Sequence, residues 1–283
     1  MSEKSENEHV PAGVDPFTPN IARMYDYYLG GKDNFAVDRA AAEEFRKIVP
    51  HIKDMARDNR EFLARAVTVM AEEGIDQFLT IGAGLPTQHH THHVAHRVNP
   101  KAVVVYTDTD PVVLAHGRAL LADNPYTTVV QADLREPEAL LDHPQIRGRL
   151  DYDRPLGVTL LSMLQFIPDE KLIARILAAV RAVLVPGSYL LISHAFKGQE
   201  SPEKLAAARA VYAKTSAGSL NPRSFEEILS FFDGFELIEP GLVPVEAWRP
   251  EWDDIVPDFT RGGMLGGVGR VPYPAQETAD AAR

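Results

Sequence analysis

Between residues 75 and 195, short apolar runs alternate with segments whose apolar residues recur every three or four positions. The apolar runs predict strands, and the amphipathic segments between them predict helices. Such alternation builds a parallel sheet with helices on both faces, and ligands bind at the carboxyl ends of its strands. The expected strands are 76–82, 102–107, 127–131, 156–162 and 188–194, and the expected helices are 86–97, 111–122, 136–142 and 169–184.

Further elements are expected on both sides of this alternating region. Apolar residues recur near helical spacing in 51–73, and Gly74 follows in the position that commonly ends a helix. The remaining expected elements are helices at 38–49 and 202–214, a helix that begins at Ser224 with Glu227 completing a capping box, and final strands at 235–238 and 263–271.

The residues that follow the first two expected strands, 76–82 and 102–107, predict a nucleoside-binding site. An apolar run ending at Ile81 is followed by Gly82 and Gly84, which permit a tight turn and close approach of a ligand to the backbone. Asp108 ends the next strand, where a carboxylate can accept hydrogen bonds from both ribose hydroxyls. Without such a ligand, the same residues would form only a glycine turn of an α/β fold.

The residues after the turn disfavour a dinucleotide. A pyrophosphate needs free N–H groups at a helix start, and Pro86 removes one of them. Thr87 stands where the dinucleotide fingerprint has a small residue. A ligand without phosphate fits better, and S-adenosylmethionine is the common one; a dehydrogenase that uses NAD is the less favoured alternative.

Composition narrows the protein class. The 283 residues carry a net charge of −11, which disfavours nucleic acid as a partner. The chain has no cysteine, so disulfides and thiolate chemistry are excluded. Its polar, acidic start does not read as a signal peptide, and no apolar run approaches the length of a membrane span. We therefore expect a cytoplasmic protein.

Several segments together resemble the actinobacterial S-adenosyl methyltransferase family, over residues 17 to 271. They are 19–35 (PNIARMYDYYLGGKDNF), 81–87 (IGAGLPT), 105–111 (VYTDTDP), 231–234 (FFDG), 240–243 (PGLV), 248–250 (WRP) and 266–270 (GGVGR). The resemblance implies an α/β class I methyltransferase fold: a Rossmann-like three-layer sandwich with a mostly parallel, seven-stranded sheet. It also implies S-adenosyl-L-methionine as cofactor, a helical N-terminal cap at 17–74 and a Rossmann-like methyltransferase domain at 75–271. The residues outside the match predict a disordered tail at 1–16 and a tail at 272–283.

The resemblance also assigns roles to individual residues. Asp133 would accept a hydrogen bond from the adenine amino group, and Leu134 would donate its backbone N–H to the ring. The full set expected at the cofactor is Gly82, Ala83, Gly84, Asp108, Thr109, Asp133, Leu134, Ser162, Met163, Tyr28 and Asn34, and the set expected at the acceptor is Gln165, Phe166, Tyr212 and Trp248. The alternatives are that Asp133 caps a helix, that Met163, Tyr212 and Trp248 are core residues, and that the N-terminal signature is a purely structural cap. Asp110 before Pro111 instead reads as a helix cap.

Two departures from the family stand out. Such methyltransferases usually carry an acid just before the glycine turn, and this chain has Thr80, which can accept a hydrogen bond but forms no ion pair. His90 and His93 replace Asn and Glu in the following helix. The pairs His89/His93 and His92/His96 share helix faces, but no carboxylate of that helix completes a metal site, so we interpret them as a solvated face and expect no metal.

Two further positions carry alternatives. His194 ends a strand and could take a proton from the methyl acceptor, although methyl transfer depends mainly on positioning and a structural histidine fits as well. Arg57, Asn59 and Arg60 either bind a carboxylate, of cofactor or substrate, or form a solvated helix face.

The sequence thus predicts an S-adenosylmethionine-dependent methyltransferase that acts on a small-molecule methyl acceptor. The alternative is a regulatory protein that binds S-adenosylmethionine or S-adenosylhomocysteine without methyl transfer. Neither the acceptor nor the oligomeric state follows from the sequence.

Overall fold

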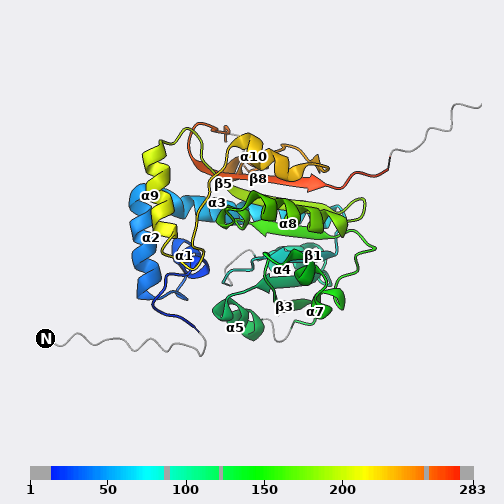
Figure 1. The fold of residues 1–283 in the computed structure, drawn as a ribbon. Helices are drawn as coiled ribbons and strands as arrows, with labels where there is room; N and C mark the ends of the chain where they lie inside the picture. Colours follow the sequence, from blue (N-terminus) through cyan, green and yellow to red (C-terminus); the bar gives the residue numbers. More distant parts are fainter. Residues whose placement is uncertain (1–13, 86–89, 121–123, 252–254, 275–283) are drawn as a thin grey trace, which may run out of the picture.

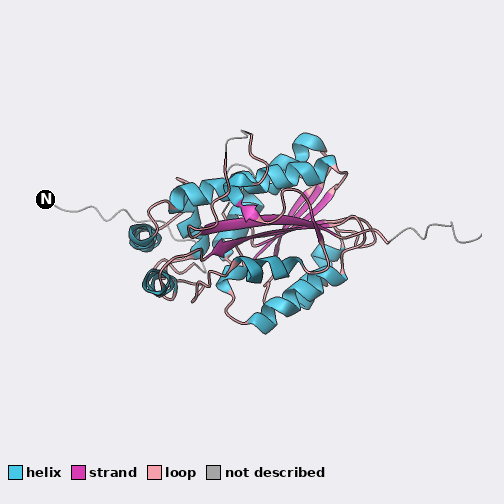
Figure 2. Ribbon diagram, turned by 90° about the horizontal axis from the view of Figure 1, so that it is seen from above, coloured by secondary structure: helices cyan, strands magenta, loops and turns pink. Residues whose placement is uncertain are grey.

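Helices cover both faces of one mixed, eight-stranded sheet in the computed structural model, which describes residues 14–85, 90–120, 124–251 and 255–274 (Figures 1 and 2). Seven strands lie in a row in the order β3-β2-β1-β4-β5-β8-β6, and β7 pairs with β8 beside that row. The strands are β1 (Gln77–Ile81), β2 (Val103–Asp108), β3 (Thr127–Gln131), β4 (Gly157–Leu161), β5 (Tyr189–Phe196), β6 (Glu236–Leu237), β7 (Val243–Pro244) and β8 (Gly263–Arg270).

The first five strands are parallel, as the alternating pattern predicts. Thr80 of β1 lies between Tyr106 of β2 and Thr159 of β4, so the carboxyl ends of these strands meet at one edge. Strand β8 runs antiparallel to β5 along its whole length. The predicted mostly parallel α/β fold is confirmed. The sheet has one strand more than the seven predicted: β7 has only two residues and is too short to give a periodic pattern in the sequence.

The first helix between the strands begins at Thr91 and not at the predicted residue 86, and the others begin and end close to the predicted positions. They are α4 (Thr91–Val98), α5 (Pro111–Leu120), α6 (Pro137–Leu141), α7 (Pro144–Arg147), the 3₁₀ turn η1 (Leu164–Phe166) and α8 (Glu170–Ala182). Pro144 begins a new helix within the region after 136–142. Residues 86–89 of the first predicted helix, and 121–122 of the second, lie outside the described residues.

Strand β4 ends one residue earlier than predicted because Ser162 has a left-handed φ of 58°. A non-glycine residue rarely adopts this conformation. The backbone N–H of Ser162 donates to the Oγ of Ser193 over 3.0 Å, and this bond helps to hold the turn. The chain therefore leaves the sheet sharply at this point and directs the following residues across the edge formed by the strand ends.

Three helices precede the sheet: α1 (Ile21–Tyr28), α2 (Ala36–Ile48) and α3 (Ile52–Glu72). Helices α1 and α2 lie beside α9 (Pro202–Tyr212), at the left of Figure 1, whereas α3 packs on the sheet against α4 and β8. A Cβ on Gly266 of β8 would lie only 2.8 Å from the ring of Phe62. The backbone of β8 thus comes into direct contact with α3, and the predicted domain division at residue 74 stays a prediction.

The remaining elements follow α9 in the chain and pack near β5 and β8. They are α10 (Phe225–Leu229) and the 3₁₀ turns η2 (Ser230–Phe232) and η3 (Val245–Ala247). The predicted capping box is confirmed, because the N–H of Glu227 donates to Ser224 and the N–H of Ser224 donates to Glu227. Most of the predicted tails, 1–13 and 275–283, lies outside the described residues.

Candidate functional site

A cavity of about 480 Å³ lies at the carboxyl ends of β1, β2 and β4. The strand ends form one side of it, and residues of α1 and α3 form the other. This is the edge of an open α/β sheet at which ligands generally bind. The site predicted from the sequence and the cavity in the structure therefore coincide in position.

The glycine turn after β1 presents bare backbone to this cavity. Gly82 has a φ of 78°, and a Cβ there would overlap the side chain of Met163. The N–H groups of Gly82 and Ala83 both donate to the carbonyl of Thr107, each over 2.9 Å. The turn is thus tied to β2, and all three predicted residues, Gly82, Ala83 and Gly84, line the cavity.

Asp108 lies at the tip of β2, beside this turn. Its Oδ2 accepts the N–H of Gly84 over 3.0 Å, and its Oδ1 accepts the N–H of Asp110 over 2.9 Å. Burial raises the pKa of the Asp108 carboxyl. Each carboxylate oxygen has a second lone pair, so both can still accept a hydrogen bond from a ligand in the cavity. Thr109 also lines the cavity.

Two residues after β3 line the cavity as predicted, Asp133 and Leu134. The Asp133 carboxylate pairs with Arg135 over 2.6 Å, and this hydrogen-bonded partner lowers its pKa. The side chain of Asp110, in contrast, accepts the N–H of Val112 over 2.7 Å, which fits the expected helix cap. Arg135 therefore partly neutralises the charge of Asp133 at the position where we expect the adenine ring.

Thr80, which stands in place of an acid, belongs to a short chain of hydroxyls. Its Oγ1 lies 3.2 Å from the donating hydroxyl of Thr159 and 3.0 Å from the hydroxyl of Thr91. These two bonds use two of the three hydrogen-bonding positions of the Thr80 hydroxyl. The cavity consequently has no carboxylate at the end of β1.

Helix α3 supplies polar groups on the opposite side. Arg60 is 8% exposed, lines the cavity, and has its guanidinium 5.3 Å from the ring centroid of Tyr25. Asn59 donates its Nδ2 to Ser162 over 2.8 Å and to the hydroxyl of Tyr25 over 3.1 Å. Arg57 is exposed and pairs with Asp54 over 2.6 Å. The structure therefore divides the predicted cluster: Asn59 and Arg60 face the cavity, and Arg57 faces solvent.

Aromatic side chains form another part of the lining. Tyr212 stacks on Phe166 at 5.7 Å between ring centroids, and the buried hydroxyl of Tyr28 has no hydrogen-bond partner in the described part of the chain. Burial raises the pKa of Tyr212 to about 12 and also raises the pKa of Tyr28. Both phenols therefore stay protonated near neutral pH. Gln165 lines the cavity as well, but its Oε1 accepts the N–H of Ala195 over 2.8 Å.

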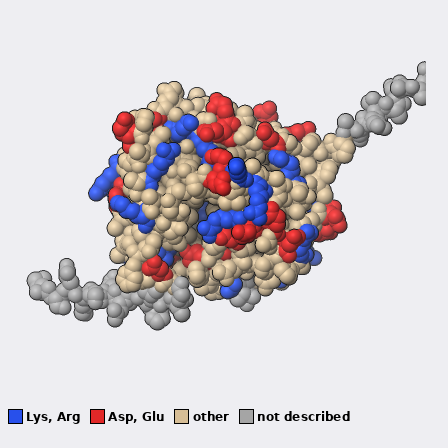
Figure 3. Space-filling view, in the orientation of Figure 1, with Lys and Arg blue, Asp and Glu red and all other residues tan. Residues whose placement is uncertain are grey.

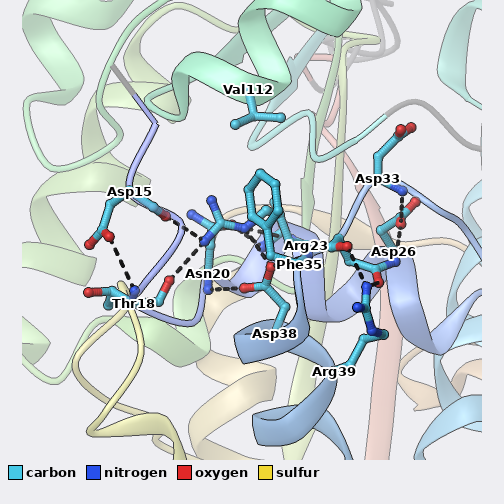
Figure 4. Close-up of polar contacts among 12 residues, drawn as sticks. Asp15, Thr18, Asn20, Arg23, Asp26, Asp33, Phe35, Asp38, Arg39 and Val112 are labelled. Atoms are coloured by element: carbon cyan, nitrogen blue, oxygen red, sulfur yellow. Dashed lines mark hydrogen bonds and ion pairs between the residues drawn. The ribbon is translucent and has the colours of Figure 1, made fainter. Parts of the chain in front are cut away.

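Seven residues near the start of the described chain, which we call the N-terminal wall, line a further side of the cavity: Val14, Asp15, Thr18, Asn20, Ile21, Ala22 and Arg23. Arg23 fastens this wall by pairing with Asp38 over 2.7 Å and by donating to the carbonyls of Asp15 and Thr18 (Figure 4). The carbonyl of Pro19 also accepts the N–H of Ser216 over 2.8 Å. The sequence gives only a weak sign of this arrangement, namely a charged Arg23 within a largely apolar helix.

Asn34 is not at the cavity, contrary to the prediction for a cofactor residue. Its Nδ2 donates to Asp26 over 2.8 Å and to the carbonyl of Gly31 over 3.1 Å. Asp26 in turn accepts the N–H of Asp33 (Figure 4). Asn34 thus shapes the turn between α1 and α2, while Tyr28 from the same signature does line the cavity.

His194 is also absent from the cavity lining, and its surroundings argue against the predicted catalytic role. The side chain is fully buried; Nδ1 donates to the carbonyl of Ala195 over 2.8 Å, and Nε2 accepts from Arg223 over 2.9 Å. Burial, with the charge of Arg223, lowers the pKa of His194 to about 3. A histidine whose basic nitrogen is already occupied cannot take a proton from a ligand.

Trp248 lies in the core instead of at an acceptor pocket. It is fully buried, and its ring meets that of Phe62 edge-on at 5.4 Å between centroids. Arg65 donates to its carbonyl over 2.7 Å. The other tryptophan, Trp252, lies outside the described residues.

The predicted solvated histidine face is wrong in part. His92 is buried, with its Nδ1 2.8 Å from the hydroxyl of Tyr106, and His90 is buried beside it. His93 is exposed, and His89 lies outside the described residues. Among the residues that the structure describes, no cluster of three His, Cys, Asp or Glu side chains is placed to hold a metal.

The surface and the helices add two observations. On the face shown in Figure 3, Lys and Arg side chains are interspersed with Asp and Glu side chains. Within the described ranges, no helix combines the length and apolar character needed to span a membrane.

Comparison with known proteins gives a family match over nearly the whole chain. The model of a family described as S-adenosyl methyltransferase matches residues 7–272. A structure of a candidate methyltransferase from Thermobifida fusca is 42% identical, with a TM-score of 0.86, and the match covers 94% of this chain and 100% of that one. A DUF574 family protein from Streptomyces avermitilis is 36% identical, with a TM-score of 0.82 and coverage of 90% and 98%.

More distant structures share the fold alone. The carbon methyltransferase CurJ is 13% identical, with a TM-score of 0.50 over 83% of this chain and 68% of that one. No match was found among the curated proteins.

Proposed function

Because the chain belongs to the S-adenosyl methyltransferase family, whose cofactor is S-adenosylmethionine, we propose that it methylates a small, largely apolar or aromatic molecule inside the cavity described above. The cofactor supplies an electrophilic methyl group on a sulfonium. The residues of this chain bind that cofactor, place the acceptor next to it and exclude water.

One observation carries the proposal: a single cavity is lined both by the glycine turn with Asp108 and by Tyr28, Phe166 and Tyr212. The first group suits a ribose, and the second suits an aromatic or apolar acceptor. At about 480 Å³, the cavity has the size of a small-molecule site and must also hold the cofactor. Room for only a small acceptor remains.

The residues fit the cofactor in three respects. The carboxylate of Asp108 keeps lone pairs for the ribose hydroxyls, and Gly84, whose Cβ position lies 3.5 Å from Nη2 of Arg60, has no side chain to fill the space that the ligand needs. The ring of Tyr25, which also lines the cavity, offers an aromatic face of the kind that attracts a sulfonium cation.

The same residues limit how the acceptor can react. No described histidine or lysine lines the cavity, and the buried phenols stay protonated. Transfer then depends on alignment of the acceptor with the methyl group. This arrangement favours an acceptor whose attacking atom is already unprotonated, such as a neutral amine nitrogen, over one that needs a strong base.

The absence of a histidine or lysine from the described cavity lining also supports the second candidate, a protein that binds the cofactor for regulation without transferring the methyl group. Calorimetry with S-adenosylmethionine, S-adenosylhomocysteine and NAD tests the shared part of both proposals. We expect micromolar binding of the two adenosyl ligands and none of NAD.

Incubation with S-adenosylmethionine and panels of small aromatic amines and phenols then separates the two. Formation of S-adenosylhomocysteine that depends on one acceptor supports methyl transfer. Binding of the cofactor without turnover on any acceptor class would favour the regulatory role. Absence of adenosyl binding would contradict both.

A further inference from the structure

Arg60 is a buried cation without an anion among the residues that the structure describes. Its side chain is 8% exposed, and within this part of the chain its Nε has no hydrogen-bond partner and no carboxylate lies within ion-pair distance. Its aromatic neighbours are uncharged: Tyr25 lies under the guanidinium, and burial together with the Arg60 charge keeps the pKa of His90 well below its usual value. A buried charge is costly unless it is paired, so this site is built for an anion that arrives with a ligand.

Asn59, which precedes Arg60 in α3, has an acceptor oxygen to which no described donor binds. The hydroxyl of Tyr25 donates its proton to the carbonyl of Ala56 over 3.0 Å, so it must accept from Nδ2 of Asn59. The second Nδ2 proton goes to Ser162. These contacts fix the orientation of the amide and leave Oδ1 buried, with no partner among the described residues. The cavity thus contains an unmatched cationic donor and, on the next residue, an unmatched neutral acceptor.

An α-amino acid group complements this pair, because it carries a carboxylate and an ammonium on one carbon. The cofactor has such a group, and its carboxylate is its only anionic group, since it contains no phosphate. The position also fits: a Cβ on Gly84 would lie 3.5 Å from Nη2 of Arg60, so the guanidinium lies beside the glycine turn that Asp108 holds. The aromatic acceptor residues line the same cavity but lie on α1, η1 and α9.

We infer that Arg60 binds the carboxylate of the amino-acid end of S-adenosylmethionine and that Oδ1 of Asn59 accepts a hydrogen bond from its ammonium. The inference rests on the proposed function. It explains how the site operates with Thr80, which has no charge, where related methyltransferases carry an acid: the ion pair of the cofactor forms at its carboxylate instead of its ammonium.

Binding measurements with two ligands test this assignment. S-adenosylhomocysteine carries the amino-acid end, and 5′-methylthioadenosine shares the adenosine and the thioether but lacks that end. We expect Arg60→Gln to weaken S-adenosylhomocysteine binding about 10- to 100-fold, the range for a hydrogen bond to a charged group, and to leave 5′-methylthioadenosine binding within about twofold. Asn59→Leu should weaken only the first ligand, about tenfold.

Arg57→Gln is the matched control, since Arg57 lies on the same helix but in solvent; it should change neither affinity. Unchanged S-adenosylhomocysteine binding in Arg60→Gln would overturn the inference, and so would an equal loss for both ligands or a loss seen only in the affinity for the methyl acceptor. If the wild-type chain binds neither ligand, the proposed function itself fails.

A comparison on the wild-type chain needs no variant and covers the case in which Arg60→Gln does not fold. S-adenosylmethionine should bind at least about tenfold more tightly than its decarboxylated form, which keeps the sulfonium and the ammonium. Equal affinities would overturn the assignment of Arg60.

Discussion

The N–H of Gly84 donates to Oδ2 of Asp108 over 3.0 Å, so the turn after β1 and the tip of β2 form one unit. This bond uses one lone pair of the carboxylate, and the N–H of Asp110 uses a second, so two remain for a ligand. The residue that is expected to bind the ribose therefore also holds the glycine turn that lines the cavity.

We expect Asp108→Ala to weaken S-adenosylhomocysteine binding by about 100-fold or more, because two hydrogen bonds to a charged acceptor are lost. Asp108→Asn keeps one acceptor oxygen and should weaken it less. Burial raises the pKa of Asp108, and the ionised form is the better acceptor. Wild-type affinity measured by calorimetry should consequently fall as the pH is lowered through this raised pKa, and Asp108→Asn should lack that dependence. Equal affinities of all three proteins would contradict the role.

Gly82→Ala should abolish cofactor binding, since the new Cβ would overlap Met163 and the φ of 78° is unfavourable for alanine. Gly74→Ala is the control: φ is 93°, but nothing lies within 4 Å of the Cβ position. The control should lose about 1 kcal/mol of stability and keep its affinity. Thermal unfolding with and without S-adenosylhomocysteine measures both effects. If S-adenosylhomocysteine still raises the unfolding temperature of Gly82→Ala, the requirement for a residue without a side chain at position 82 is disproved.

Arg23→Met should destabilise the chain by about 3–5 kcal/mol, because it leaves Asp38 buried and unpaired. Arg46→Met removes the exposed pair with Glu43 and should cost less than about 1 kcal/mol. Urea unfolding followed by circular dichroism gives both values. Similar losses in the two variants would show that the Arg23 pair is no more important than a surface pair.

Asp58 is expected to make stability depend on pH. Burial, and then the charges of Glu246 and Glu61, raise its pKa to about 6. The folded state therefore binds more protons than the unfolded state between about pH 4 and 6, and the free energy of unfolding falls as the pH rises through this window. Asp58→Asn should add about 1 kcal/mol at pH 7, after allowance for partial exposure.

The gain from Asp58→Asn should vanish below about pH 4, where the wild-type carboxyl is protonated in both states. Asp54→Asn on the same helix removes an exposed pair with Arg57 and should give no gain at either pH. Denaturant titrations at pH 7 and pH 4 check the sign; a gain that is the same at both would rule out ionisation as its cause.

Local patterns were sufficient to predict strands β1 to β5 and the place of the glycine turn and Asp108 at the cavity. Strands β1 and β2 are largely buried, mostly apolar runs, and the positions of Gly82 and Asp108 follow from where those runs end. Parallel strands then bring their carboxyl ends together without further information.

The residues expected at the methyl acceptor were harder to predict, because contacts with residues distant in the sequence determine where their side chains lie. Trp248 is held in the core by Arg65, 183 residues earlier in the chain, and His194 is occupied by Arg223. Similarly, Arg60 faces the cavity while Arg57, less than one helical turn away, faces solvent. No periodicity in the sequence distinguishes a tyrosine that lines a cavity from a tryptophan that fills a core.

The packing of Gly266 against Phe62 has a consequence for how this sequence can vary. Any side chain at position 266 would place a carbon 2.8 Å from the Phe62 ring and 2.9 Å from Val245. A saturation library selected for folding should therefore accept only glycine at 266 unless positions 62 and 245 become smaller at the same time. Three positions that are distant in the sequence would then vary together, and intolerance to mutation at β8 would reflect close packing of its backbone and not a role in chemistry.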